Sequence, residues 1–249
     1  MSETTQAVTY ANYLKLEELL SLQQPRSSGP EHDEMLFIVI HQVYELWFKQ
    51  LLHELDRVKA LLEQDESHHA QHTLKRILTI LKVMVAQLDI LETMTPLEFL
   101  SFRARLEAAS GFQSDQFRQI EFVLGLQSAQ AINRFPEGGR ARAALERRYH
   151  ESTLWDAFLQ YVRREGYQFE DPQPALITIY RNDPKNAELC ERLVDLDEGI
   201  QEWRYRHVKM VERTIGARPG TGGSSGAAYL RETLGRPLFP DLWAIRSQL

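Results

Sequence analysis

The sequence predicts an all-α fold, a single domain built on long antiparallel helices. Apolar residues recur at steps of three and four along most of the 249 residues, which is typical of helices packed on one face. Only Ala175–Tyr180 has the β-branched content expected of a strand. No repeat and no linker with independent domains on both sides interrupts the chain, so residues 1–249 are expected to form one domain.

Proline, glycine and polar segments set the expected helix boundaries in the first half of the chain. The capping-box pattern Thr95-Pro96-Leu97-Glu98 predicts that a helix begins there. The preceding helices are expected over Tyr13–Leu22, Asp33–Leu62 and His72–Glu92, with a polar turn at Asp65–His69. Met35–Ile40 is apolar on all sides, which predicts that this part of its helix lies inside the protein.

The second half is expected to hold shorter helices and one long one. The short helices are predicted over Asp115–Gly125, Gly139–His150 and Ser152–Arg164, followed by a loop over Gly166–Pro174. Pro184 then suits the first position of a long helix that reaches Ile215.

Composition and charge exclude several classes of protein. The 29 basic and 35 acidic residues leave a net charge of −6 without a long run of either sign, which argues against nucleic-acid and membrane partners. The start lacks a signal-peptide pattern, and the longest apolar run is far too short for a bilayer span. A single cysteine, Cys190, excludes a disulfide framework. We therefore expect a soluble protein of the cytoplasm.

Two histidines stand in unusual surroundings. His41 follows the apolar stretch and has Phe37 one turn before it. His207 lies late in the long C-terminal helix, and Trp203 lies one turn before it. A histidine on such a face is either a hydrogen-bonded core residue or a ligand or catalyst, and the residues alone leave both readings open.

The other histidine patterns favour structural readings. His68, His69 and His72 include the i, i+4 spacing that can hold a metal, but their polar surroundings favour an exposed turn. His53-Glu54 resembles the start of a zinc-protease helix, and that motif fails because position 57 is arginine.

A glycine-rich segment, Gly220–Gly226, reads Gly-Thr-Gly-Gly-Ser-Ser-Gly. It lacks the Gly-Lys-Ser/Thr ending of a phosphate-binding loop and the glycine spacing of a dinucleotide fingerprint. Its position before an apolar pair favours an ordered loop that closes over a ligand rather than a floppy linker. Arg103, in an otherwise apolar segment, suits a bidentate contact to a carboxylate, but the residues alone favour an arginine whose stem covers the core while its head stays in water.

In combination, these segments resemble the tryptophan 2,3-dioxygenase family of haem enzymes. Five blocks occur in the family's order: Tyr10–Leu14, His32–Gln42, Tyr44–Lys49, Ser110–Ser114 and Gly220–Gly226. Arg103 and the Trp203–His207 segment also fall where the family has them. The resemblance implies a helical domain that encloses a pocket for haem b, with the iron ferrous in the active state.

The resemblance also implies roles for the matching residues. His207 corresponds to the proximal ligand of the haem iron, and His41 to the catalytic distal histidine that accepts the indole N–H of the substrate. Arg103 corresponds to the clamp on the tryptophan carboxylate. Further implied contacts to substrate or cofactor come from Phe37, Leu106, Ser110, Gly220 and Thr221.

The N-terminal residues take a different implied role. Tyr10, Tyr13 and Leu14 correspond to a helix that completes the pocket of a neighbouring subunit, so residues 1–30 are expected to form an arm in a homotetramer. The segment Arg164–Pro184 is shorter than its bacterial counterpart, which affects peripheral helices and none of the residues named above.

The implied reaction inserts O₂ across the indole C2–C3 bond of L-tryptophan and gives N-formyl-L-kynurenine, the first step of the kynurenine pathway of tryptophan catabolism. Two alternatives stay open at this stage. One is a haem-dependent monooxygenase of the same superfamily that acts on tryptophan or a substituted indole. The other is a haem-binding sensor without catalysis, which would have no reason to keep His41, Arg103 and Thr221 together.

Overall fold

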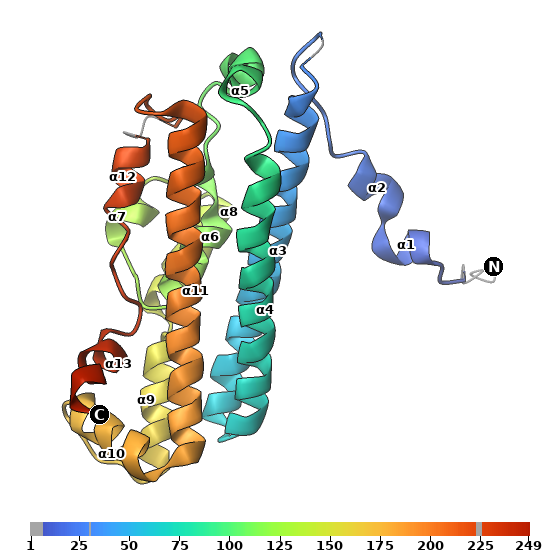
Figure 1. The fold of residues 1–249 in the computed structure, drawn as a ribbon. Coiled ribbons are helices and arrows are strands. Elements are labelled where there is room, and N and C mark those ends of the chain that lie inside the picture. The colour runs from blue at the N-terminus through green and yellow to red at the C-terminus, as the bar shows by residue number, and fades with distance from the viewer. Residues whose placement is uncertain (1–6, 30, 223–225) are drawn as a thin grey trace.

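Three long helices form the frame of the molecule. The computed structural model describes residues 7–29, 31–222 and 226–249, and over these residues it contains helices and no strand, which confirms the all-α prediction. The frame consists of α3 (Asp33–Glu63), α4 (Ser67–Leu91) and α11 (Pro184–Ile215). Helix α4 packs against both others, and α3 runs antiparallel to α4 and α11 (Figure 1).

Shorter helices cover the sides and ends of this frame. Helices α6 and α9 pack on α3, while α10, α12 and α13 pack around α11. Their bounds are α5 (Pro96–Arg103), α6 (Asp115–Val123), α7 (Ala129–Ile132), α8 (Arg140–His150), α9 (Leu154–Arg164), α10 (Pro172–Asn182), α12 (Ala227–Arg231) and α13 (Pro240–Ala244), with 3-10 turns η1 (Ala104–Leu106), η2 (Gly111–Gln113) and η3 (Arg246–Gln248). The main hydrophobic core extends from α3 to the residue after α13, and a smaller cluster lies around Phe122 of α6 and Leu145 of α8.

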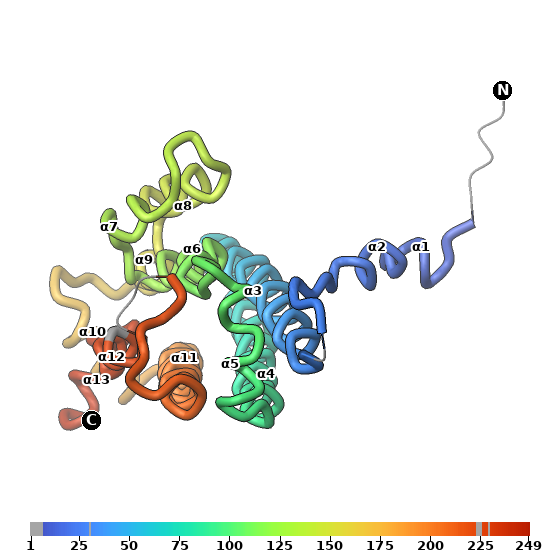
Figure 2. The backbone as a smooth tube through the Cα atoms, turned by 90° about the horizontal axis from the view of Figure 1, so that it is seen from above, coloured from blue at the N-terminus to red at the C-terminus, as the bar shows by residue number. Residues whose placement is uncertain are grey.

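The N-terminal segment leaves the bundle. Instead of the single helix expected over Tyr13–Leu22, there are two short helices, α1 (Tyr10–Leu14) and α2 (Leu16–Leu20), because Lys15 between them has a left-handed backbone with φ of 55°. Both helices stretch away from the frame in two perpendicular views (Figures 1 and 2). The root of this arm is held by Glu34, a buried residue whose carboxylate accepts the backbone N–H groups of Arg26 and Ser27.

Most helix ends agree with the sequence prediction to within two residues. The differences lie in the first helix, which is divided in two, at the start of α4, and in α10. Helix α4 begins at Ser67 and not at His72, because Ser67 and Ala70 are buried and extend its packed face. His68, His69 and His72 are exposed, as predicted, but they lie on α4 and not in a turn.

The strand-like residues Ala175–Tyr180 lie in helix α10. This helix begins at Pro172, so it also includes the end of the loop predicted over Gly166–Pro174. Asp171 caps this helix by accepting the N–H of Gln173, and Pro172 takes its first position. Leu176 and Ile179, one turn apart, are buried against the core, so helical packing overrides the β-branched composition.

The prediction that the stretch Met35–Ile40 lies wholly inside the protein is wrong. Ile40 faces the core, whereas Met35 and Val39 are 42% and 39% exposed. The start of α3 is covered on one side only, so its opposite face remains apolar and open in this chain. No helix in the described part of the chain is long and apolar enough to cross a membrane.

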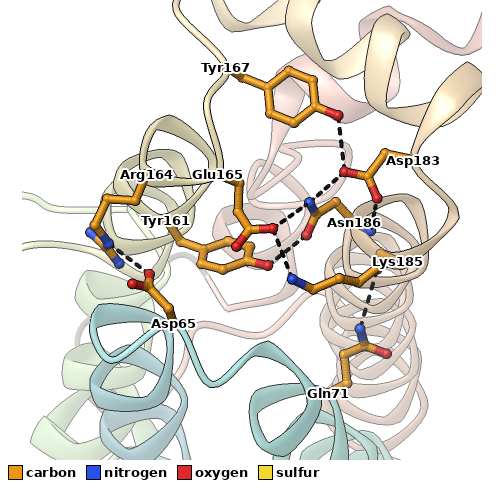
Figure 3. A network of polar contacts seen from close by, with 9 residues as sticks. All are labelled: Asp65, Gln71, Tyr161, Arg164, Glu165, Tyr167, Asp183, Lys185 and Asn186. Carbon is orange, nitrogen blue, oxygen red and sulfur yellow. Dashed lines mark hydrogen bonds and ion pairs between the residues drawn. The ribbon is translucent and has the colours of Figure 1, made fainter.

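The end of the bundle formed by the α3–α4 turn is closed by a polar network (Figure 3). The buried Tyr161 hydroxyl donates to the Asn186 side chain at 2.8 Å, and Asn186 donates to Asp183 at 2.7 Å. Lys185 pairs with Glu165 at 2.9 Å. These contacts fix α9 to the start of α11, and each polar group in them has a partner, so the network has a structural role.

A second buried group, Asp197, fixes the C-terminal segment to α11. This fully buried carboxylate accepts the backbone N–H groups of Leu238 and Phe239 at 2.8 and 3.0 Å and the indole N–H of Trp243 at 2.9 Å. The contacts bring α13 and the residues before it back onto the frame. A buried carboxylate with several donors is stable only while all of these contacts are kept.

We predict that Asp197→Ala lowers the free energy of unfolding by about 3 kcal/mol, because two buried backbone N–H groups and the partly buried Trp243 indole lose their acceptor. Urea denaturation measures the loss. Asp195→Ala, on the same helix with a side chain 45% exposed, is the control and should change stability by less than about 0.5 kcal/mol. Equal stability of the two variants would contradict the role of Asp197.

Candidate active site

A cavity lies at the end of the bundle where α3 begins and α11 ends. Its walls come from α3, α5, α6 and α11, from the chain between α5 and α6, and from the glycine-rich segment after α11. Aromatic and aliphatic side chains make up most of the lining. The cavity brings together eight residues singled out from the sequence: Phe37, His41, Arg103, Leu106, Ser110, His207, Gly220 and Thr221.

His41 enters the cavity from α3 as a neutral acceptor. Its Nδ1 lies 2.7 Å from the carbonyl oxygen of Phe37, and since a carbonyl can only accept, Nδ1 carries the proton. Burial lowers the pKa of His41, which keeps the ring neutral at pH 7. Nε2 is therefore left with a lone pair, so the residue can accept a hydrogen bond from a bound molecule.

His207 enters the same cavity from α11. Burial lowers its pKa to about 4, so the imidazole is neutral at physiological pH. Its ring lies parallel to that of Trp203, with centroids 5.2 Å apart, and it makes no hydrogen bond with any residue that the structure describes. A neutral imidazole in an apolar wall without a hydrogen-bond partner is suited to bind a metal centre.

Aromatic rings set the position of His41. The Phe37 ring lies 4.0 Å from the His41 ring, and Phe99 and Phe102 lie 5.8 and 5.6 Å from Phe37. Phe102 is fully buried, so these rings link the start of α3 to α5. No spacing rule in the sequence indicated that Phe99 and Phe102 pack around Phe37.

Two hydrogen bonds form a roof over the cavity. Arg103, the last residue of α5, donates from Nη2 to the carbonyl oxygen of Pro219 at 2.6 Å. Thr221 donates from its hydroxyl to the carbonyl oxygen of Ala109 at 2.5 Å. These bonds join the chain after α11 to the chain after α5 through Pro219 and Thr221. The expectation that Gly220–Gly226 closes over a ligand stays a prediction.

Glycine is required at two positions of this roof. A Cβ at Gly222 would lie 2.5 Å from the Cβ of Ser110, which is closer than two such atoms can approach. Gly226 has a φ of +67°, and a Cβ there would lie 2.6 Å from the carbonyl oxygen of Arg218. Residues 223–225, also part of the predicted loop, lie outside the described residues.

A charged cluster lines the cavity wall between α6 and α11, and sequence reasoning missed it. It consists of Arg118 and Glu121 on α6 and Arg204 on α11. Glu121 accepts from both arginines, at 2.5 and 2.9 Å. The i, i+3 spacing of Arg118 and Glu121 was visible in the sequence, but only the fold brings Arg204 to them.

The N-terminal candidates do not join this cavity. Tyr10 and Tyr13 are each 76% exposed and Leu14 is 42% exposed, on helix α1 in the projecting arm. Their predicted place in a neighbouring subunit therefore stays a prediction.

Taken together, the cavity can bind a flat apolar molecule that carries an N–H donor and an anionic group. The acceptor is His41, the cation near the roof is Arg103, and the opposite helix supplies a second neutral imidazole, His207. The combination supports a metal-bearing cofactor and an aromatic substrate in one space.

The family model and the related proteins that match this chain carry the same description. The family model described as tryptophan 2,3-dioxygenase matches residues 1–165 and 141–249. A protein named tryptophan 2,3-dioxygenase from Herpetosiphon aurantiacus is 59% identical, covering 98% of this chain and 100% of its own. Proteins of the same name from Anaeromyxobacter sp. and Nocardioides sp. are 54% and 47% identical, covering 98% and 97% of this chain and 97% and 95% of their own.

We predict that Gly222→Ala separates the roof from the Ala109–Ser110 backbone, because the added methyl group collides with Ser110. Hydrogen–deuterium exchange of residues 104–114 and 216–222 should become faster. Gly111→Ala is the matched control, since a Cβ there meets no atom within 4 Å, and its exchange should stay at the wild-type rate. Unchanged exchange in Gly222→Ala would show that the close approach does not hold the roof.

Proposed function

The chain belongs to the tryptophan 2,3-dioxygenase family, and we propose that it opens the indole ring of L-tryptophan by inserting O₂ across C2–C3, giving N-formyl-L-kynurenine. The observation that carries this proposal is the state of His41. Its Nδ1 is committed to the Phe37 carbonyl, so Nε2 presents an acceptor inside an apolar cavity. The indole N–H is a donor only, and it matches that acceptor.

The roof supports recognition of the amino-acid part of the substrate. Arg103 carries a permanent positive charge and donates one N–H to the Pro219 carbonyl oxygen. Its other guanidinium N–H groups can donate to a carboxylate. Thr221 lies in the same roof, and Ser110 and Leu106 line the wall below it. A carboxylate at this end and an indole N–H at His41 would fix the substrate at two points and orient its ring.

The cavity also fits haem. His207 is neutral, lies against Trp203 and has no competing hydrogen bond among the described residues, which suits an axial ligand to haem iron. Apolar side chains such as Phe48, Phe117 and Val208 line the same space and suit a porphyrin face. When bound, haem b in its ferrous form would supply the activation of O₂, which amino-acid side chains cannot provide.

The remaining role of the protein is to orient the substrate and to limit its contact with water. Phe37 packs against His41 and keeps its ring in place, so the acceptor does not have to be reoriented when the indole arrives. The two roof bonds, Arg103 to Pro219 and Thr221 to Ala109, hold the chain after α11 over the cavity. Exclusion of water favours insertion of both oxygen atoms into the ring over side reactions.

The projecting N-terminal arm supports a proposal for how the subunits assemble. Tyr10, Tyr13 and Leu14 are exposed on helix α1, and we assign them to the cavity of a neighbouring subunit in a homotetramer. The exposed apolar face of α3 at Met35 and Val39 supports a subunit contact beside the arm. A cytoplasmic location stays a prediction.

We predict that Arg103→Gln keeps haem but raises the KM for L-tryptophan at least about tenfold, because the carboxylate loses a charged partner. The Soret band and steady-state kinetics measure the two effects. Arg105→Gln is the control, since Arg105 is exposed and does not line the cavity. An unchanged KM in Arg103→Gln would exclude the carboxylate contact.

We further predict that His41→Ala reduces discrimination between L-tryptophan and 1-methyl-L-tryptophan. The wild-type enzyme should prefer tryptophan, since only the unmethylated indole can donate to Nε2. Removing the acceptor removes this preference even where overall turnover falls. The ratio of the two kcat/KM values is the measurement, and the same ratio in both proteins would rule out the indole contact.

A further inference from the structure

The cluster of Arg118, Glu121 and Arg204 carries more positive than negative charge in a buried place. The side chain of Arg204 is 5% exposed, that of Arg118 is 13% exposed and that of Glu121 is 12% exposed. Glu121 is the only carboxylate that pairs with either arginine among the described residues. Two guanidinium groups thus share one carboxylate, and the group keeps an excess positive charge away from bulk water.

Arg204 also has an unused donor. Its Nη2 donates to Glu121 at 2.9 Å, while Nη1 is buried without a hydrogen-bond partner among the residues that the structure describes. A buried guanidinium N–H without an acceptor is costly, and proteins seldom keep one unless something else supplies the acceptor. Since Arg204 lines the cavity, that acceptor can come from a molecule bound there.

The position of the cluster separates it from the roof. Arg204 lies one helical turn before His207 on α11, so both side chains project from the same face of that helix. Arg103 lies on α5, where it is bonded to Pro219. The cavity therefore has one cationic wall beside the proposed axial ligand and another at the roof.

We propose that Arg204 and Arg118 form the seat for a propionate group of haem. The inference rests on the proposed function, and it assigns the two cationic walls to two carboxylates: the cofactor's beside His207 and the substrate's at Arg103. Haem held by His207 would share the cavity with the wall of α11 and α6 that carries Arg204 and Arg118. A propionate there supplies the acceptor that Arg204 lacks and balances the excess charge.

Comparison of haem with haem dimethyl ester tests the seat, because the ester keeps the iron and the ring but loses both negative charges. Apo-protein is titrated with each ligand, and the Soret band gives the two affinities. Wild-type protein should bind haem at least about tenfold more tightly than the ester. Arg204→Gln should lose most of this preference, while Arg192→Gln, a partly exposed arginine on the same helix, should retain it.

Glu121→Gln is a second variant for the same titration, and it tests the seat even if Arg204→Gln does not fold. Removing the competing carboxylate frees both arginines, so the preference for haem over its ester should grow. A preference that stays at the wild-type value in both Arg204→Gln and Glu121→Gln would overturn the seat. Wild-type protein that binds haem equally well as acid and ester would also overturn it and leave the proposed function intact. Wild-type protein that binds neither ligand would overturn the proposed function itself.

Discussion

The packing of α4 between α3 and α11 is the constraint on which the site depends. His41 and His207 lie on helices that are joined mainly through α4, whose Leu81, Met84 and Leu88 are almost fully buried. At the cavity end, Arg206 of α11 pairs with Asp89 of α4 at 2.5 Å. A change in this packing would move one imidazole relative to the other, and both must face the same cavity for the proposed chemistry.

Burial then determines what the two imidazoles can do. The apolar wall lowers both histidine pKa values, so each ring is neutral and offers a lone pair where a protonated ring would offer none. The hydrogen-bond surroundings differ, and they divide the roles: His41 is tied to the Phe37 carbonyl, whereas His207 is held by stacking on Trp203. The same helix frame thus provides an acceptor for the substrate and a ligand for the cofactor.

Much of this could be predicted from the sequence, because helix periodicity and caps are local. The ends of α11 at Pro184 and Ile215 agree with the prediction, as does the capping box at Thr95. The roles of the eight cavity residues came from the family resemblance, since a lone histidine or arginine fits several readings. The cluster at Glu121 and the exposed face of Met35 could not be found, because both depend on which surfaces the fold brings together.

The fate of the two oxygen atoms tests opening of the indole ring most directly. Reduced, haem-loaded protein is given L-tryptophan under ¹⁸O₂, and the product is analysed by mass spectrometry together with the visible spectrum. We expect N-formylkynurenine that carries both labelled atoms. One labelled atom on an intact indole skeleton would contradict ring opening and favour monooxygenation, and a Soret band without product would favour a haem-binding protein without this activity.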